Sequence, residues 1–458
     1  MHLIFFYFGG ISMFWEKVNN LVWGIPTLIL ILGVGLYLSV QTGWVQIRFL
    51  PRAIRKFWRM LTATSGDSTP FQSLCNALAA TVGTGNLVGV AGALCLGGPG
   101  AIFWMWVGGF LGMATKFAEA TLAIRYRKKV YGGYACGPMY MITMGMGERF
   151  LPLALCYSLF GIIASFGVGN ATQINAVVSG INSILSNFGI QPGFLGNLLQ
   201  GLLLAVIIGM LLLGGAKKIG NVTQTLIPVV SAAYILLGIL ALILRYQAIP
   251  QAFVSIIQGA FHPAAVTGGM VGSAFQALRV GSSRGVFTNE AGMGTASMAH
   301  GSANVDHPAE QGLMGIMEVF LDTIVICTLT ALVILTSGIS IPYGKEASAL
   351  TGLSFSKVCG GWSEYVVTGA LILFAVATVL GWGIYGNQCV TFLIGEKYWK
   401  PFALVQIAMV IFSAVADAAS VWSAAQAING LMAIPNLIAL AALSKEVVRL
   451  VKEYKEAG

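Results

Sequence analysis

The segment FQSLCNALAATVGTGNLVGVAGALCL, residues 71–96, is apolar enough to cross a bilayer, yet its middle contains VGTGN at residues 82–86. A backbone N–H or C=O without a partner costs several kcal/mol in hydrocarbon. Irregular backbone therefore persists at membrane depth only where protein buries it or where it lines a cavity. The interruption predicts a broken spanning helix whose free backbone groups bind a polar solute.

The composition is that of an integral membrane protein. Of the 458 residues, 57% are hydrophobic and only 9% are charged, whereas roughly 25% are charged in a soluble domain. Residues 1–14 are apolar but too short to span, and no basic residues precede them, so we do not expect a cleaved signal peptide. A spanning helix needs about 20 largely apolar residues. We expect an all-α protein with eleven spans, at residues 20–41, 71–96, 101–124, 150–185, 197–214, 222–244, 267–298, 311–336, 364–394, 401–415 and 420–443.

The positions of lysine and arginine predict the orientation. Most of the 25 basic residues fall in loops that share one side of the membrane if the loop between the first two spans is cytoplasmic. Basic residues accumulate on the cytoplasmic side, so we expect the N-terminus outside and the C-terminus in the cytoplasm. The net charge of +9 then reflects topology. No nucleic-acid partner is expected, because no basic and aromatic motif accompanies the charge.

Cysteine and histidine give no sign of a metal or redox site. The seven cysteines do not form a disulfide framework, and the four histidines lack metal-ligand spacing. We therefore expect no cofactor. Close helix packing explains most of the 58 glycines.

The chain divides into related halves. The ten spans after the first form two sets of five, and the first span of each set carries an interruption; the second is GSSRG at 281–285, running on to NEAG at 289–292. Broken helices at matching positions indicate the binding site of a secondary transporter built from inverted repeats. We expect the following segments: an N-terminal helix and an amphipathic cytoplasmic stretch at 1–62, a ten-helix core at 63–445 with repeats 71–246 and 264–445, and a cytoplasmic tail at 446–458.

A helix broken in the membrane offers sites for both an anion and a cation. N–H groups at the start of its second half attract a carboxylate, and C=O groups at the end of its first half attract a cation. A zwitterionic amino acid and Na⁺ suit this arrangement. The alternative for glycines in a spanning helix is close packing, but the presence of two breaks favours a binding function.

Four motifs resemble one family. NALAATVGTGNLVGV at 76–90, GPGA at 98–101, GPMY at 137–140 and RGVFTNEAGMG at 284–294 are similar to the alanine/glycine:cation symporters, also called sodium:alanine symporters. The resemblance implies a LeuT-like fold of 5+5 inverted repeats with one extra N-terminal helix. It also implies a plasma-membrane location and uptake of alanine or glycine coupled to Na⁺ or, in some members, to H⁺.

The resemblance also implies a substrate site between the two breaks. Residues expected to contact the amino acid from these breaks are Thr81, Gly83, Thr84, Gly85, Asn86, Gly281, Ser282, Phe287, Thr288 and Asn289. Asn170 and Gln173 lie three residues apart on one helix, and their side-chain oxygens can hold the ammonium. Trp382, Phe166 and Phe287 can limit the pocket volume. The alternative is that these polar and aromatic residues only join helices.

The resemblance further implies a cation site formed by the carbonyl oxygens of Ala79 and Val82 and the Thr378 hydroxyl, since Na⁺ prefers oxygen ligands. Thr378 and Trp382 lie four residues apart and face the same way.

Carboxylates within spans are functional candidates, because burying a charge in lipid is costly. Glu119 follows Lys116 by three residues, which favours a local ion pair. Glu290 follows the second break and can pair with Arg284, accept N–H bonds from the unwound turn, or act as a gate. Glu318 and Asp322 share one helix face, so two close carboxylates there favour a second cation or a proton-linked site.

Other functions remain as alternatives. A carrier coupled to H⁺ could take another small or polar amino acid such as serine or glutamine. A membrane-embedded enzyme would need a nucleophile or metal constellation, and no H-E-x-x-H or G-x-S-x-G on a plausible strand–helix turn is present. An ion channel would more naturally repeat one filter loop around an oligomeric axis.

Overall fold

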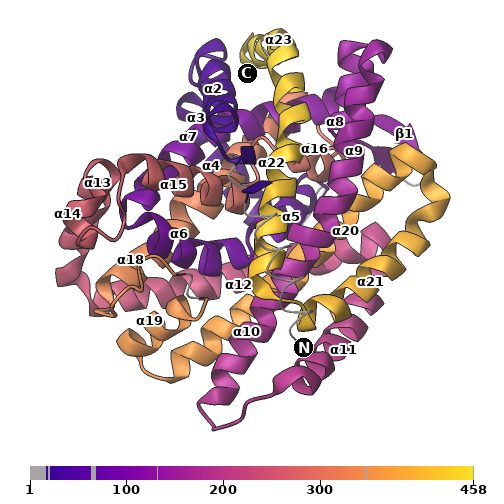
Figure 1. Ribbon diagram of the computed structural model, residues 1–458. Coiled ribbons are helices and arrows are strands. Elements are labelled where there is room, and N and C mark those ends of the chain that lie inside the picture. Colours follow the sequence, from indigo (N-terminus) through magenta and orange to yellow (C-terminus); the bar gives the residue numbers. More distant parts are fainter. Residues whose placement is uncertain (1–16, 19–20, 63–68, 131–132, 346–347, 457–458) are drawn as a thin grey trace.

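The chain folds as a bundle of helices in the computed structural model, which describes residues 17–18, 21–62, 69–130, 133–345 and 348–456 (Figure 1). Residues 1–14 lie outside this part of the chain. The helices at the expected spans are α2 (Ile25–Gln41), α5 (Thr69–Thr81), α6 (Val90–Gly97), α7 (Gly100–Arg125), α9 (Leu151–Phe166), α10 (Thr172–Ser186), α11 (Gly193–Leu212), α12 (Gly215–Leu244), α15 (Ala274–Asn289), α16 (Thr295–His300), α17 (Pro308–Val319), α18 (Thr328–Thr336), α20 (Trp362–Ile394), α21 (Trp399–Val415) and α22 (Ala418–Ala442).

The number of helices that are long and apolar enough to cross a membrane is smaller than the eleven spans expected from the sequence. Within the described residues, eight helices are long and apolar enough to cross a membrane, or nine if the bent pair α5 and α6 is one span. The two expected spans that do not meet this measure are α2, which has 17 residues, and the segment 267–298, which is divided between α15 and α16.

Several shorter elements lie outside the expected spans. These are α3 (Val45–Arg48), α4 (Leu50–Thr62), α8 (Pro138–Met141), α13 (Ile249–Phe261), α14 (Pro263–Thr267), α19 (Leu350–Cys359), α23 (Ser444–Glu456), η3 (Glu148–Phe150), η5 (Tyr246–Ala248) and η7 (Glu396–Tyr398). Of these, α3 and α4 occupy the cytoplasmic stretch that the sequence predicts to be amphipathic, whereas no helix was expected at the positions of other short helices such as α13 and α19. The all-α expectation also needs a small correction, because β1 (Lys128–Val130) pairs antiparallel with β2 (Gly133–Ala135).

Four wide π-helical turns occur in the described part of the chain. They are η1 (Gly85–Gly89), η2 (Ile142–Met146), η4 (Gly167–Ala171) and η6 (Phe320–Cys327). Such turns are rare and occur frequently at functional sites. Three of them, η1, η4 and η6, contain the candidate residues Asn86, Asn170 and Asp322, so the regular α-helical ladder is interrupted where the sequence places function.

The first break is where the sequence predicts it, but the second is shifted. The helix axis bends by 48° between α5 and α6. In the second half, α15 continues through 281–285, and the chain unwinds only at 290–294. Glu290 there has φ 55°, and Gly292 and Gly294 have φ 92° and 83°.

The glycine at the start of the expected second break serves close packing. A Cβ atom on Gly281 would overlap the Ala101 carbonyl oxygen and would lie 2.8 Å from Trp104 Cβ. Glycine therefore lets α15 approach α7 without unwinding, so the prediction of a break at 281–285 is wrong.

Corresponding helices of the two expected halves pack against each other. The contacting pairs are α7 with α17, α11 with α21, α9 with α20, and α6 with α15. Pairing of equivalent elements is the arrangement expected around a pseudo-two-fold axis. The extra helix α2 packs outside this core, against α7 and α22.

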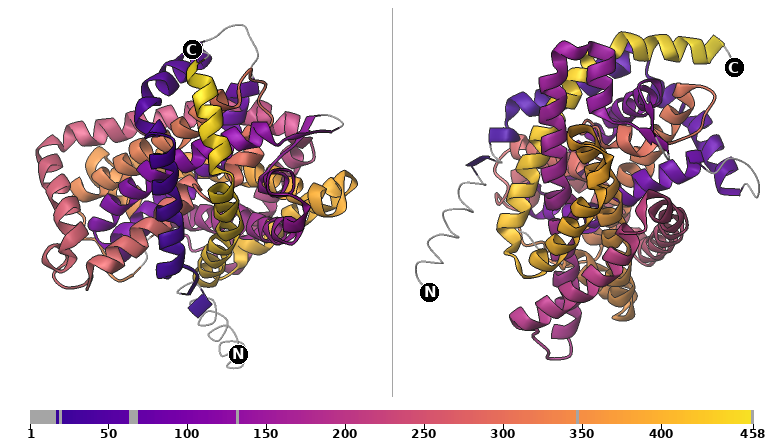
Figure 2. Two further views of the ribbon diagram at one scale, coloured as in Figure 1. Left: turned by 90° about the horizontal axis from the view of Figure 1, so that it is seen from above. Right: turned by 90° about the vertical axis from the view of Figure 1, so that its right-hand side faces the viewer.

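The C-terminal helix α23 turns away from α22 at one end of the bundle (Figure 2). It buries Val447, Leu450 and Val451 and packs against α7 and α17. Its Glu446 accepts a bond from Arg125 Nε at 2.9 Å. The segment predicted as a tail is thus a helix packed on the core throughout its described part.

Candidate functional site

The first break presents backbone N–H groups, and two carboxamide oxygens accept from them. Gly83 N–H donates to Asn86 Oδ1 at 2.9 Å, and Thr84 N–H donates to Gln173 Oε1 at 3.3 Å. All four residues are buried. The donors that the sequence assigns to a substrate carboxylate therefore exist, and neutral side-chain oxygens hold them.

The Asn86 side chain is fixed from its other end. Its Nδ2 donates to Asp322 Oδ1 at 2.6 Å and contacts Cys327 Sγ at 3.2 Å. Asp322 Oδ2 accepts from the Thr323 hydroxyl at 2.8 Å. Asp322 on the π-turn η6 is thus a positioning residue for the first break.

Oxygen atoms also gather at the end of α5. The Thr378 hydroxyl donates to the carbonyls of Ala79 at 2.9 Å and Phe374 at 3.0 Å. A Cβ atom on Gly83 would lie 2.5 Å from Thr378 Oγ1 and 3.2 Å from Gln173 Oε1. Oxygens of Thr378 and Gln173 therefore lie beside Gly83, and the Ala79 carbonyl lies beside the Thr378 hydroxyl. Na⁺ prefers such oxygen ligands.

The two broken helices touch at Gly85. A Cβ atom on Gly85 would lie 2.9 Å from Thr288 Cγ2 and 3.4 Å from Phe287 Cδ1. Thr288 itself donates to the Gly285 carbonyl at 2.8 Å, one turn back in α15. Only a residue without a side chain allows this approach.

The unwound turn of the second break is held by Glu119. Its Oε1 accepts from the N–H groups of Gly292 at 3.0 Å and Gly294 at 3.1 Å, and from Asn436 Nδ2 at 2.8 Å. The ion pair expected between Glu119 and Lys116 is therefore replaced by backbone capping. Sequence reasoning missed Asn436, since no local signal connects it to a loop 144 residues away.

Glu290 bonds to neither of its expected partners. Its Oε1 accepts from Trp382 Nε1 at 2.8 Å. Arg284 lies instead over the Trp422 ring, 5.5 Å from its centroid. The left-handed backbone at Glu290 directs its side chain toward α20, so the proposed pairing with Arg284 is wrong.

The two carboxylates on α17 and η6 have separate partners. Glu318 Oε1 pairs with Lys116 Nζ at 2.8 Å, and Glu318 Oε2 lies 3.1 Å from His300 Nε2. Asp322 is bonded to Asn86. The expectation of one cation shared by Glu318 and Asp322 is therefore not met, because the Lys116 ammonium already occupies Glu318.

Some predicted site residues face other helices. Asn170 Nδ2 donates to the backbone and side-chain oxygens of Gln406, both at 2.8 Å, so Asn170 points to α21 while Gln173 points to the break. Phe166 packs on Phe402, with centroids 5.5 Å apart. The π-turn η4 between Phe166 and Gln173 changes the rotation of the helix, which breaks the expected three-residue spacing.

The remaining candidates near the breaks have other partners or none among the described residues. Asn289 Nδ2 donates to Thr323 Oγ1 at 3.0 Å, and its Oδ1 accepts from Ala291 N–H at 2.9 Å. The Thr81 hydroxyl donates to the backbone carbonyl of Ala77, one turn earlier in α5. Ser282 and Val82 are buried. The roles assigned to these four residues stay predictions.

One residue outside the predicted set completes the first break. Thr351 Oγ1, from the unexpected helix α19, donates to the Leu87 carbonyl in η1 at 2.8 Å. It satisfies a carbonyl that the π-turn displaces from the α-helical pattern.

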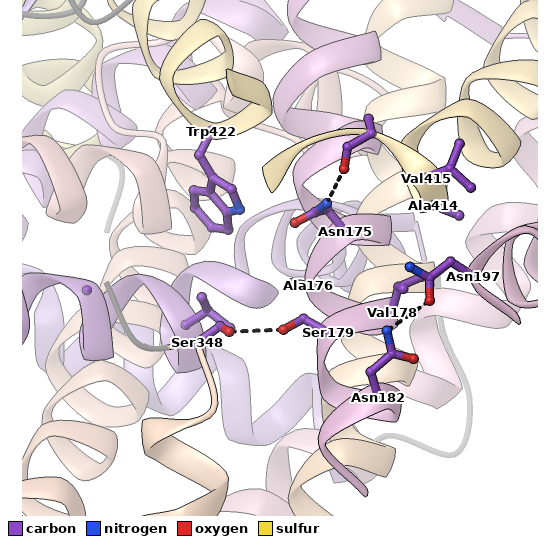
Figure 3. A pocket seen from close by; sticks show the side chains of 13 residues that line it. Asn175, Ala176, Val178, Ser179, Asn182, Asn197, Ser348, Ala414, Val415 and Trp422 are labelled. Carbon is purple, nitrogen blue, oxygen red and sulfur yellow. Dashed lines mark hydrogen bonds between the residues drawn. The ribbon is translucent and has the colours of Figure 1, made fainter. Parts of the chain in front are cut away.

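A cavity of about 430 Å³ lies between α6, α10 and the start of α22. Figure 3 shows its polar wall, where Asn182 bonds to Asn197 at 2.9 Å and Ser179 bonds to Ser348 at 3.0 Å, with Trp422 on the other side. Trp422 packs on Phe287 with ring centroids 5.2 Å apart. One aromatic pair thus lies between this cavity and Gly85.

The chain is similar to known proteins over nearly its whole length. A model of the Sodium:alanine symporter family matches residues 10–458. The chain is 42% identical to "Sodium/alanine symporter AgcS" of Methanococcus maripaludis over 96% of both chains. It is 34% identical to "Probable sodium/glutamine symporter GlnT" of Bacillus subtilis, over 96% of this chain and 90% of that protein. The crystal structure of MhsT in complex with L-phenylalanine matches with a TM-score of 0.56 at 13% identity, covering 83% of this chain and 97% of that chain. This last likeness shows a shared LeuT-like fold.

Proposed function

Because the chain belongs to the sodium:alanine symporter family, we propose that it imports alanine or glycine together with Na⁺ by alternating access. The family makes the protein a multi-pass membrane transporter for cation-coupled amino-acid symport, and not an enzyme. The choice of substrate, ion and mechanism is our proposal.

The observation that carries the proposal is the meeting of both broken helices at Gly85. The N–H groups of Gly83 and Thr84 lie beside this contact, and the oxygens of Asn86 and Gln173 accept from them. A carboxylate is a stronger acceptor for such donors than a neutral amide. We propose that the substrate carboxylate replaces at least one of these amide oxygens.

We place the cation site at the end of α5, directly before the first break. Carbonyls of Ala79 and Val82, with the Thr378 hydroxyl, offer hard oxygen ligands at the end of α5. Na⁺ bound there joins α5 to α20, because Ala79 and Thr378 lie on these two helices. Ordering of α5 by Na⁺ then prepares the neighbouring N–H groups for the carboxylate. Such coupling is reciprocal, so each ligand raises the affinity for the other by the same factor.

The cavity beside Trp422 is the proposed entry path from outside. With the C-terminal helix in the cytoplasm, the junction of α21 and α22 faces the exterior. The Trp422 and Phe287 rings then form a gate between the cavity and the first break. Trp382 and Phe287 restrict the volume for a substrate side chain, which favours alanine or glycine.

A counterflow assay tests the function. Proteoliposomes filled with unlabelled alanine are expected to take up labelled alanine faster than buffer-filled vesicles, and only with Na⁺ present. A channel would show no acceleration by internal alanine. Equal uptake with and without internal alanine would contradict the carrier assignment.

A second candidate is a carrier for glutamine or serine, coupled to Na⁺ or H⁺. The relative named as a probable sodium/glutamine symporter favours this alternative. Competition by a panel of amino acids decides between them, because a site limited by Trp382 and Phe287 should reject glutamine while accepting glycine.

A further inference from the structure

Basic residues gather where the ends of two neighbouring spans meet. Helices α3 and α4 follow directly after α2, and α23 follows directly after α22. The spans α2 and α22 pack against each other, and α2 also contacts α23, so α2 and α23 lie close together at the top of Figure 1. The Tyr37 hydroxyl of α2 lies 3.2 Å from Ser444 Oγ at the start of α23. Segments 407 residues apart in the sequence therefore meet near the end of α2.

Four of these basic residues lie around one aromatic side chain. Arg52 Cζ lies 5.4 Å from the centroid of the Phe49 ring, and Lys455 Nζ lies 5.9 Å from the same centroid. Partial burial and then the positive charges of Arg48 and Lys452 lower the pKa of Lys455, so these two cations are close to it. We call Arg48, Arg52, Lys452 and Lys455 the basic cluster. Its members come from α3, α4 and α23.

Carboxylates of the protein do not neutralise the basic cluster. Helices α3, α4 and α23 contain nine basic residues and three acidic ones. Glu446 and Glu453 pair with Arg449, Glu310 pairs with a lysine of α4 at 2.7 Å, and Glu456 is exposed in the last described turn of α23. None of the ion pairs between described residues includes a member of the cluster. Four like charges thus lie close together, and an anion between them would offset their repulsion.

Large apolar side chains on the same short helices are exposed. Ile47 of α3 is 56% exposed and Trp58 of α4 is 58% exposed. The other side of α4 packs on the core through Ile54 and Phe57. Tryptophan favours the interface between membrane and water, and a helix with exposed basic and apolar groups binds anionic lipid there. The surface therefore offers cations for a phosphate and apolar contacts for acyl chains.

We propose that the basic cluster binds the phosphodiester headgroup of an anionic phospholipid, which joins α4 to α23. A lipid fits better than a soluble anion, because the cluster lies at the ends of two spans and exposed apolar side chains accompany it. The phosphate lies between Arg52 and Lys455 in this arrangement. Both α4 and α23 pack on α17, so the lipid ties these peripheral helices to the core. This binding does not rest on the proposed transport function.

Lipid binding by the full-length protein tests the proposal. Native mass spectrometry with dioleoylphosphatidylglycerol or dioleoylphosphatidylcholine compares an anionic and an uncharged headgroup on the same acyl chains. We expect tighter binding of phosphatidylglycerol. The double variant Arg52→Gln, Lys455→Gln should bind it about 30-fold more weakly, since each basic residue near an anionic surface contributes a factor of about five. Equal affinity of the native protein for both lipids would overturn the proposal and favour an acidic soluble partner for the cluster.

Two further variants separate the cluster from a general attraction to positive charge. Lys397→Gln with Lys400→Gln removes two cations that also lie near aromatic rings, at 5.0 and 5.7 Å from the centroids, and should leave phosphatidylglycerol binding unchanged. Arg52→Lys with Lys455→Arg keeps both charges and should bind as the native protein does. An equal loss in the Lys397 and Lys400 variant would overturn the proposal, as would native affinity in Arg52→Gln, Lys455→Gln.

Discussion

Gly83 and Gly85 permit close contacts at the first break because glycine has no side chain. At Gly83 a missing side chain leaves room for the oxygens of Thr378 and Gln173, and at Gly85 it lets two helices touch. The sequence predicts this site because free backbone in a membrane is a local and costly feature. It does not predict where Asn170 and Phe166 point, because a π-turn sets the rotation of their helix.

Substitution of Gly85 is expected to abolish transport. A methyl group in Gly85→Ala would lie 2.9 Å from Thr288 Cγ2, closer than side-chain atoms pack, and Gly85→Leu would separate the helices further. Gly89→Ala is the matched control in the same π-turn, since its methyl group would lie 3.9 Å from the same atom. Counterflow of labelled alanine measures the effect, and thermal melting checks the fold. Native uptake by Gly85→Leu would remove the substrate assignment.

Replacement of Thr378 by valine is expected to weaken the dependence on Na⁺. The variant keeps the shape but loses one oxygen beside Ala79, so half-maximal uptake should need several-fold more Na⁺. Thr336→Val is the control, because that hydroxyl bonds within its own helix. Uptake is measured against Na⁺ concentration at saturating alanine. An equal loss of alanine selectivity would count against a separate cation site.

At the scale of elements, glycine alone does not locate a broken helix. The glycines at 281–285 permit α15 to pack on α7, while the chain unwinds at 290–294, where Glu119 caps free N–H groups. The long apolar spans are predictable from hydropathy. The short helices α13 and α19 are not, because their burial depends on neighbours distant in sequence.

Loss of the carboxylate at Glu119 is expected to destabilise the second break. Hydrogen bonds to a charged group contribute about 1.5–3 kcal/mol each, so Glu119→Gln should lower the melting temperature and slow transport. Glu148→Gln removes an exposed carboxylate outside the break and serves as control. Melting in detergent and counterflow are measured on the same preparations. An unchanged melting temperature for Glu119→Gln would show that the cap is dispensable.

At the scale of the whole molecule, helices at corresponding positions of the two expected halves pack against each other, and the cavity beside Trp422 lies between α6, α10 and the start of α22. The sequence predicts the two halves from the repeated interruption. It contains no signal for the cavity, because residues from α6, α10, α22 and the loop at Ser348 form it together.

If the C-terminal helix lies in the cytoplasm, reagents outside the cell should reach the cavity beside Trp422. Ser179→Cys, in a background without native cysteines, is expected to react with a membrane-impermeant thiol reagent added outside intact cells. Lys452→Cys on α23 should react only after permeabilisation. Alanine with Na⁺ should slow labelling at Ser179→Cys by closing the cavity. Labelling of Lys452→Cys in intact cells would invert the orientation.

The central claim is that both broken helices form one site for an amino acid. The most direct measurement is an experimental structure of the protein with alanine and Na⁺. We predict the alanine carboxylate at the N–H groups of Gly83 and Thr84, beside Phe287 and Thr288, with Asn86 or Gln173 displaced. Alanine bound elsewhere, with those amide oxygens still in place, would contradict the account.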